Sequence, residues 1–242
     1  MTREPRSDVP VARVTLRESA TPITALVTKF GGQPVWLGEP RWPLSATDGT
    51  PMRFVAQVAL DPRLFGDGVQ ARMAYVFLAQ DDPTLWTADG HLAGVDGALV
   101  LQPGPTDYPH VPSERGPALH RLVERRGGLL GLKRQYEPVP CEYAVELEYA
   151  TEPPLAAVDS ESEDYDDYDD EDTDRVGSGT KVGGTPAFIQ DVELPGEPPC
   201  TTLVLQIADD DDLFSLPLGD VGSLYAFMDA RGTRGGLVIQ SH

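Results

Sequence analysis

The residues best suited to bind a metal ion form a short acidic run near the C-terminus. Asp209 to Asp212 are consecutive aspartates, and Asp220 follows a few residues later. Carboxylate oxygens bind hard cations such as calcium, so Asp209, Asp211 and Asp220 are weak candidates for a cation site. The run lacks the ligand spacing, mid-loop glycine and closing glutamate of an EF-hand loop, and charge runs commonly mark exposed turns. We therefore favour a solvated turn and predict no metal and no cofactor.

Three tryptophans offer a second kind of site. Trp36, Trp42 and Trp86, with Arg41 beside them, could line an aromatic groove for a small ligand or a peptide. Large aromatic side chains more often pack in a core. We therefore favour core packing, and Trp36, Arg41 and Trp42 remain a possible ligand groove.

The residues of nucleophilic, redox and nucleotide chemistry occur without their usual partners. The four histidines form no HExxH pattern, and Cys141 and Cys200 have neither a close pairing nor the local signature of a catalytic thiol. Lys181 in "GSGTKVGG" is not followed by Ser or Thr, and the glycine spacing of a phosphate loop fails. The sequence therefore favours a protein that is not an enzyme, although an uncharacterised activity stays open.

Acidic residues dominate the charge of the chain. There are 39 acidic residues against 19 lysines and arginines, a net charge of −20, and eleven of the acids lie between Asp159 and Asp174. This balance argues against nucleic-acid binding and favours a basic partner. One hypothesis is that the acidic run folds back onto the dense cationic segment, but a solvated helix face beside an unstructured tether is the preferred interpretation. The cationic segment comprises Arg121, Arg125, Arg126, Lys133 and Arg134.

No part of the chain resembles a targeting or membrane segment. The N-terminus has no apolar run like that of a signal peptide, and no stretch approaches the roughly 20 apolar residues that span a bilayer. We expect a cytoplasmic protein without a membrane partner.

The elements that must position these residues are mainly strands. Cys141 to Tyr149 alternates apolar and polar residues, which predicts a strand with one buried and one exposed face, and 24 glycines with 23 prolines indicate many turns. Ser113 could cap a helix over residues 114–126, which Gly127 and Gly128 would end. Further strands are expected at Val11–Leu16, Arg53–Leu60, Met73–Ala79, Gly97–Gln102, Thr202–Ile207, Ser223–Met228 and Gly236–Gln240.

The most informative pattern is an internal repeat. The segment "KFGGQP" recurs as "KVGGTP", the strand "FVAQV" recurs as "LVLQI", and "AYVF" recurs as "LYAF", in one order and at nearly constant spacing. Double glycine followed by proline suits a sharp turn into a strand edge. A glutamine inside an apolar strand must be hydrogen-bonded, and we expect the irregular backbone at the glycine turn to supply its partners. The shared positions are Lys29, Gly31, Gly32, Pro34 and Gln57 in the first half and Lys181, Gly183, Gly184, Pro186 and Gln206 in the second.

The same segments resemble the YwqG-like family, a bacterial domain of unknown function. "GGQP", the "RWP" at Arg41 to Pro43 and "GTPMRFVAQV" are similar to its first signature, and "KVGGTPAFIQ", "LVLQIADDDD" and "LGDVGSLYAFM" to its second. The acidic insert departs from the pattern, as does the second half's lack of a tryptophan–proline segment. The resemblance implies a mainly β roll with internal duplication, and it supplies no established activity.

We expect one mainly β body, a β-roll or sandwich-like fold with internal duplication and a few short helices. Its halves would be residues 1–152 and 180–242, joined by an acidic disordered linker at 153–179 whose composition cannot repay the entropy of ordering. The favoured function is a non-enzymatic protein-interaction module, an immunity or regulatory factor for a basic protein. The alternative is a protein or enzyme that binds a small ligand or divalent cation in the aromatic groove, and a purely structural role also stays open.

Overall fold

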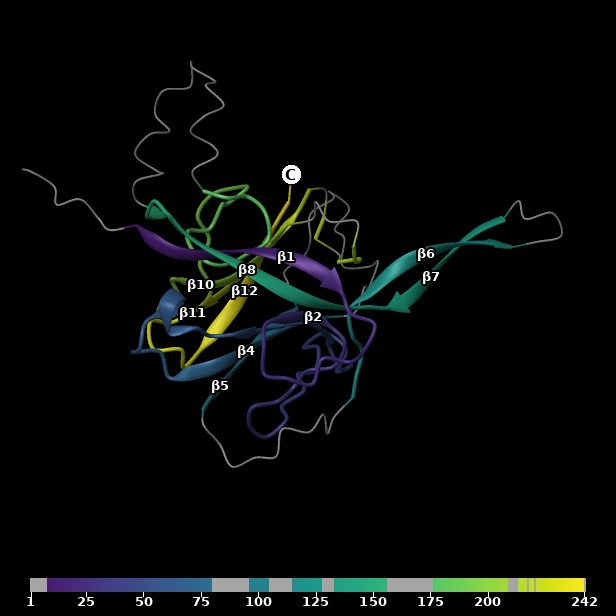
Figure 1. Ribbon diagram of the computed structural model, residues 1–242, viewed down its shortest axis with the longest axis horizontal. Coiled ribbons are helices and arrows are strands. Elements are labelled where there is room, and N and C mark those ends of the chain that lie inside the picture. Colours follow the sequence, from purple (N-terminus) through teal and green to yellow (C-terminus); the bar gives the residue numbers. More distant parts are fainter. Residues whose placement is uncertain are drawn as a thin grey trace, which may run out of the picture.

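Two long strands, β1 (Val9–Glu18) and β8 (Glu142–Glu152), form the centre of the fold. A computed structural model describes residues 8–79, 96–104, 115–127, 133–155, 176–208, 213–216, 218–219 and 221–241. In it β1 and β8 pair antiparallel over their whole length, from Val9 opposite Glu152 to Glu18 opposite Tyr143. The two strands cross the body together in Figure 1.

Four further strands lie on each side of this central pair. The order in the ten-stranded sheet is β12-β11-β10-β9-β1-β8-β2-β3-β4-β5, so each half continues outward in chain order. Beside β8 lie β2 (Lys29–Gly31), β3 (Arg53–Ala59), β4 (Ala71–Leu78) and β5 (Gly97–Pro103), and beside β1 lie β9 (Lys181–Gly183), β10 (Thr202–Ala208), β11 (Ser223–Met228) and β12 (Gly235–Gln240).

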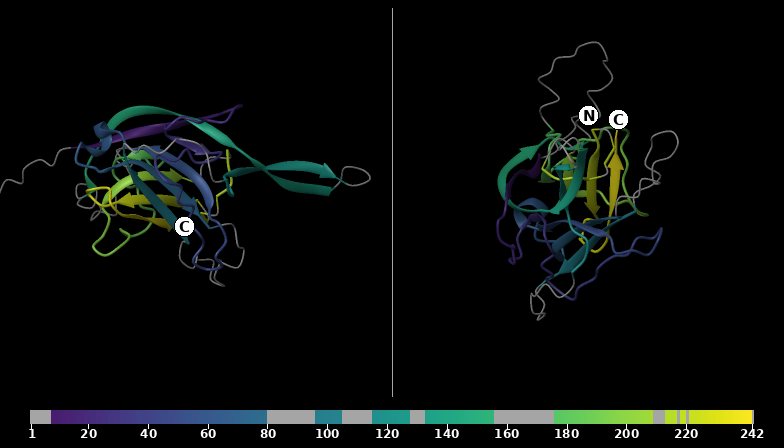
Figure 2. Two further views of the ribbon diagram at one scale, coloured as in Figure 1. Left: turned by 90° about the horizontal axis from the view of Figure 1, so that it is seen from below. Right: turned by 90° about the vertical axis from the view of Figure 1, so that its right-hand side faces the viewer.

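The sheet curls until its outer strands meet. A Cβ atom on Gly97 of β5 would lie 2.7 Å from Leu237 of β12, and one on Gly235 would lie 2.6 Å from Leu99. The sheet is therefore nearly closed into a barrel, as both views in Figure 2 indicate. Its interior holds one apolar core from both halves, including Phe30, Val58, Val76, Val204, Ile207, Leu224 and Met228.

Each half also carries a small outer core. Tyr75 and Phe77 alternate with inward residues of β4 and therefore face outward, where Trp36 packs on both rings. In the second half, Tyr225 and Phe227 of β11 face outward in the same way, and Phe188 packs on them. Phe188 thus fills the place that Trp36 fills in the first half.

The predicted helix over residues 114–126 is wrong in its described part. Residues 120–127 form the strand β6 (His120–Gly127), which pairs antiparallel with β7 (Lys133–Pro140) in a separate two-stranded sheet. Leu119 is buried in the core, while Leu122 is 53% exposed, so the supposed apolar stripe is divided between core and solvent. Pairing with β7 overrides the local pattern. The hairpin projects from the body in Figures 1 and 2 and is called the arm below.

The mainly β prediction is confirmed, and the named helix in the described chain is a single turn, α1 (Pro62–Phe65), capped by Asp61. The expected strands are present at or close to the expected residues. Both ends of the expected linker, 153–155 and 176–179, are described. Ser113, Trp86, Asp209, Asp211, Asp220 and residues 156–175 lie outside the described residues.

Candidate functional site

The repeated lysines are buried at equivalent positions. Lys29 lies opposite Gln57 in the β2–β3 ladder, and Lys181 lies opposite Gln206 in the β9–β10 ladder. Lys29 Nζ donates to the carbonyl oxygens of Ile23 and Gln33, at 3.0 and 2.7 Å, and Lys181 Nζ donates to that of Thr185 at 2.5 Å. Each ammonium group therefore ties together the backbone around its glycine turn.

The two lysines take their carboxylates from opposite ends of the same strand. Lys29 Nζ lies 2.6 Å from Glu142 Oε1, and Lys181 Nζ lies 2.9 Å from both oxygens of Glu152. Burial lowers the pKa of both lysines, and their hydrogen bonds to the glutamates oppose that shift. The buried lysine is thus part of the repeat, whereas both glutamates that pair with the lysines come from the single strand β8.

The double glycines are required by backbone geometry. Gly31 and Gly32 have φ of 66° and 62°, and Gly183 and Gly184 have φ of 70° and 80°. This left-handed region is readily adopted by glycine alone. The N–H of Gly32 donates to the carbonyl oxygen of Cys141 on the chain entering β8, and the N–H of Gly184 donates to that of Pro10 in β1. The turns therefore attach each half to the central strand pair, and the buried Pro34 and Pro186 follow them.

The repeated glutamines clamp the chain on either side of these turns. Gln57 Oε1 accepts from Val35 N–H at 2.8 Å and its Nε2 donates to Val27 O at 2.8 Å. Gln206 Oε1 accepts from Ala187 N–H at 3.0 Å and its Nε2 donates to Ser178 O at 2.8 Å. Both amides are buried and bonded to backbone, so they hold the fold and offer no surface to a ligand.

A second pair of glutamines escaped the sequence analysis. Gln102 ends the apolar run "LVLQ" in β5 and accepts from Gly38 N–H, while Gln240 ends "LVIQ" in β12 and accepts from Gln190 N–H. Both clamp the loop that covers the outer core of their half. The signal was available, because an apolar run ending in glutamine is also the pattern around Gln57 and Gln206.

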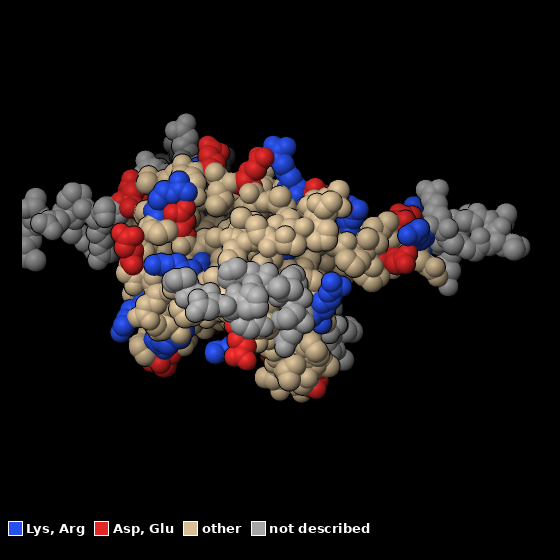
Figure 3. Space-filling model, turned by 60° about the horizontal axis from the view of Figure 1, so that its bottom comes forward, with Lys and Arg blue, Asp and Glu red and all other residues tan. Residues whose placement is uncertain are grey.

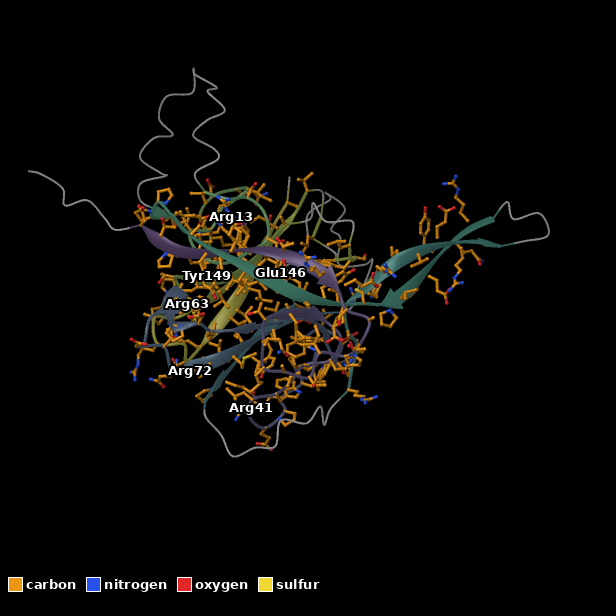
Figure 4. The ribbon with its side chains drawn as sticks, in the orientation of Figure 1. Arg13, Arg41, Arg63, Arg72, Glu146 and Tyr149 are labelled. Carbon is orange, nitrogen blue, oxygen red and sulfur yellow. The ribbon has the colours of Figure 1, made fainter. Side chains whose placement is uncertain are left out.

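The two described tryptophans, Trp36 and Trp42, do not line an open groove. Trp36 has no exposed surface and packs in the first outer core, as the core-packing interpretation predicts. Trp42 is partly buried, its Nε1 donates to Met52 O at 2.8 Å, and its ring packs edge-on to Trp36. Arg41 is exposed on the adjoining loop, where Figure 4 labels it.

An open groove does lie along β8. It has a volume of about 390 Å³ and is bounded by the loop before β2, by the end of β3 and by β8 itself. Its walls are mainly apolar. The lining residues are Ile23, Leu26, Val27 and Thr28 of the loop, Ala59 at the end of β3 and Asp61 after it, and Ala144, Val145, Leu147 and Tyr149 of β8.

The edge of β8 inside this groove has no strand partner among the described residues. β2 is three residues long and pairs with β8 only from Glu142 to Ala144. The carbonyl oxygen of Glu142 accepts from Ser19 N–H on the β1 side, and that of Cys141 accepts from Gly32 N–H on the β2 side. Because backbone groups point alternately to the two sides of a strand, those of Val145, Leu147 and Tyr149 face the groove.

A polar cluster stands at the far end of the groove. The Arg63 guanidinium lies 4.0 Å from the ring centre of Tyr149, and Arg63 Nη2 donates to Asp61 Oδ2 and to Tyr149 Oη. Hydrogen bonds from Arg63 hold the pKa of Asp61 well below its usual range, and burial raises the pKa of Tyr149. Figure 4 labels Arg63 and Tyr149 close together. The cluster is charged at neutral pH and open to solvent.

Charges are mixed on the face of the molecule shown in Figure 3, where basic and acidic side chains are interspersed around an uncharged band. Within the described ranges no three His, Cys, Asp or Glu side chains gather as a metal site would require. No helix in the same ranges is long and apolar enough to span a bilayer.

Comparison with known families gives one match. The family model of a domain of unknown function (DUF1963) matches residues 28–232. That range begins just before β2 and includes both glycine turns, the arm and three of the four clamping glutamines; Gln240 lies beyond it. No curated protein matches the chain.

Proposed function

The chain belongs to the DUF1963 family, a domain of unknown function, and from that premise we propose that it is a non-enzymatic protein-interaction module. It captures an extended segment of a partner as an added strand on the open edge of β8. The observation that carries this proposal is the run of backbone groups at Val145, Leu147 and Tyr149 that lie inside an apolar groove and pair with no strand in the described part of the chain.

Strand addition uses both features of this groove. Main-chain hydrogen bonds to an open edge supply affinity, and the pockets beside it accept alternate side chains of the added strand. Loop residues Leu26 and Val27 form the opposite wall, and Val145 and Leu147 lie on the strand itself. An extended segment with apolar residues at every second position fits this arrangement.

The partner's charge follows from the charge of the module. With a net charge of −20, the chain attracts a basic protein over distances of about a Debye length, ~10 Å at 0.1 M salt. We infer an immunity or regulatory factor that acts in the cytoplasm. The finer assignment to the YwqG-like branch, and descent of the two halves from one duplicated unit, are part of the same proposal. The matched registers and glutamine clamps of the halves support the duplication.

A proline substitution in β8 tests the strand addition. Leu147→Pro removes an N–H that faces the groove, whereas Leu147→Val keeps it and serves as the matched control. The probe is a short fluorescent peptide that alternates valine and lysine, with binding read by fluorescence anisotropy. We expect the wild type and Leu147→Val to bind and Leu147→Pro to bind at least about tenfold more weakly, ~1.4 kcal/mol. Circular dichroism verifies that both variants are folded. Equal binding by folded Leu147→Pro, or undiminished binding of a peptide N-methylated at alternate residues, contradicts the proposal.

A small ligand is the second candidate for the same groove. The exposed cluster of Asp61, Arg63 and Tyr149 favours it, since a few polar groups at the end of an apolar groove can orient a ligand. A thermal-shift screen with metabolites and divalent cations tests this function, because a ligand of the native state raises the melting temperature. A genuine hit loses its effect in Arg63→Met and keeps it in Arg17→Met, which alters an arginine outside the groove lining.

A further inference from the structure

The arm exposes an apolar surface that a stable hairpin would cover. Leu122 is 53% and Tyr136 is 61% exposed. In the β6–β7 register Leu122 lies opposite Pro138 and Tyr136 lies opposite Glu124, so the two exposed residues share one face of the ribbon. An isolated two-stranded hairpin is at best marginally stable in water. This face is therefore suited to contact another segment.

The arm is basic in an acidic protein. From His120 to Pro140 the sequence holds five lysines and arginines against two glutamates, a net charge of +3, which leaves −23 for the rest of the chain. Arg121 pairs with Glu18, Arg125 with Glu137 and Arg134 with Glu124, all at solvent-accessible positions where such pairs stabilise little. An acidic segment can therefore compete for these arginines at little cost in stability.

One segment of the same sequence matches both properties of the arm. Residues 159–174 carry eleven acidic residues and no basic one, and Tyr165 and Tyr168 stand among the acids. The carboxylates complement the arginines of the arm. The phenol rings complement its exposed apolar face and can stack on guanidinium groups.

Reach decides whether this contact forms within one chain or between two. The acidic segment leaves and re-enters the body beside Glu152, because Gly177 N–H donates to Glu152 Oε1 and Thr185 Oγ1 donates to Pro153 O. The 20 residues from 156 to 175 could reach at most about 34 Å out from this point and back, even if fully extended. The eleven residues of β8 span about 36 Å to the root of the arm, and the eight residues of β6 extend about 26 Å further. A chain's own acidic segment reaches at most the root of its arm.

We propose that the arm binds the acidic segment of a second copy, so that copies associate head to tail. The arm and the described residues that flank the acidic segment lie at opposite ends of β8, as Figure 1 shows for the arm and for the end of β8 beside β1's first residues. Contacts between different surfaces of successive copies produce rings or open chains rather than a two-fold dimer. This inference is independent of the groove along β8.

Complementation between two variants tests the association. In the first, Arg125, Arg126, Lys133 and Arg134 are changed to Gln; in the second, the eleven acids of residues 159–174 are changed to Asn or Gln. Mass is measured by light scattering after size exclusion. The wild type should exceed the monomer mass at low salt and return to it near 1 M salt, where the Debye length falls to about 3 Å. Each variant alone should be monomeric, and their mixture should form a heterodimer.

A peptide competitor gives a second readout on the unaltered protein. A synthetic peptide of residues 159–174 should dissociate wild-type oligomers, and the same peptide with both tyrosines changed to serine should do so less well. A wild type that stays monomeric at low salt overturns the proposal, as does a mixture of two folded variants that forms no heterodimer. Arm-dependent binding of a monomeric wild type to phosphatidylserine vesicles would also overturn it and assign the arm to a membrane surface.

Discussion

The ammonium group of Lys181 lies 2.9 Å from both carboxylate oxygens of Glu152, and the two side chains are only 2% and 5% exposed. The corresponding pair in the first half, Lys29 and Glu142, is closer at 2.6 Å but has a carboxylate that is 12% exposed. The equivalent buried lysines are therefore neutralised by carboxylates that differ in solvent exposure. The effect of this difference on stability can be measured.

Removing either carboxylate should destabilise the fold, and Glu152 should matter more. Loss of one partner from a buried ion pair costs about 3–5 kcal/mol, because the other charge stays buried without compensation. We expect Glu152→Gln to lie in this range and Glu142→Gln to lie below it, since water reaches Glu142 more easily. Urea unfolding measures both free energies, with exposed Glu148→Gln as the control. A Glu142→Gln variant that is the less stable of the two would contradict this ranking.

The first glycines of the two turns should respond differently to alanine. Gly31 and Gly183 have nearly the same positive φ, so each substitution carries a backbone cost of about 1–2 kcal/mol. A Cβ on Gly31 would also collide with the Cys141 carbonyl oxygen, whereas one on Gly183 would lie 3.2 Å from the Pro10 carbonyl oxygen. Gly31→Ala should therefore lower the free energy of unfolding more than Gly183→Ala in chemical denaturation. Equal losses would mean that the backbone near Cys141 moves aside.

The glutamine clamps should be equivalent in the two halves. Gln57→Leu and Gln206→Leu each leave buried backbone donors and acceptors unpaired, at about 1–3 kcal/mol for each group. Both variants should lose several kcal/mol in thermal and urea unfolding. The matched control is exposed Gln135→Leu on the arm, which should change little. A tolerant Gln206→Leu would show that the second clamp is dispensable.

Alkaline pH should unfold the protein cooperatively with release of buried phenol protons. Burial raises the pKa of Tyr75, Tyr143 and Tyr225, and it raises the pKa of Cys141 to about 11. The unfolded chain therefore loses these protons at lower pH than the folded chain, and their contribution to stability falls as pH rises through about 9 to 10 and above. The lowered pKa values of Lys29 and Lys181 have the opposite effect on the pH dependence of stability. Deprotonation of a lysine does not change tyrosinate absorbance, so it does not interfere with the measurement.

The check is absorbance at 295 nm, which follows tyrosinate, compared with circular dichroism over the same pH range. The buried phenols should ionise in one step together with loss of structure. Independent titration of all eight tyrosines before unfolding would contradict the assignment of three to the core.

The strands were predictable where one chain segment alone carries the signal. Cys141 to Tyr149 alternates, and Thr202 to Ile207 is a continuous apolar run, so both indicate strands without knowledge of their neighbours. The arm was mispredicted because Leu119, Leu122 and Val123 have helical spacing. Its partner strand β7 contains Pro138 and Pro140, which are tolerated only because β7 is an edge strand.

The candidate site was predictable in part. Because each repeated glutamine lies inside an apolar strand, its need for hydrogen-bond partners on the backbone could be predicted. Glu142 and Glu152 could not be assigned to the lysines, because they lie far from them in sequence and come from different ends of β8. The groove was invisible for another reason. It exists because β2 begins only at Lys29, opposite Ala144, while β8 continues to Glu152, and relative strand length is a property of the assembled sheet.

The position of β1 between the two halves means that this strand is synthesised long before either of its partner strands. One edge of β1 pairs with β8 and the other with β9, so neither neighbour exists when β1 leaves the ribosome. At about 5–20 residues per second, the β9 edge stays uncovered for roughly 10–30 seconds. Throughout that interval the nascent chain exposes a strand edge on which another chain can pair.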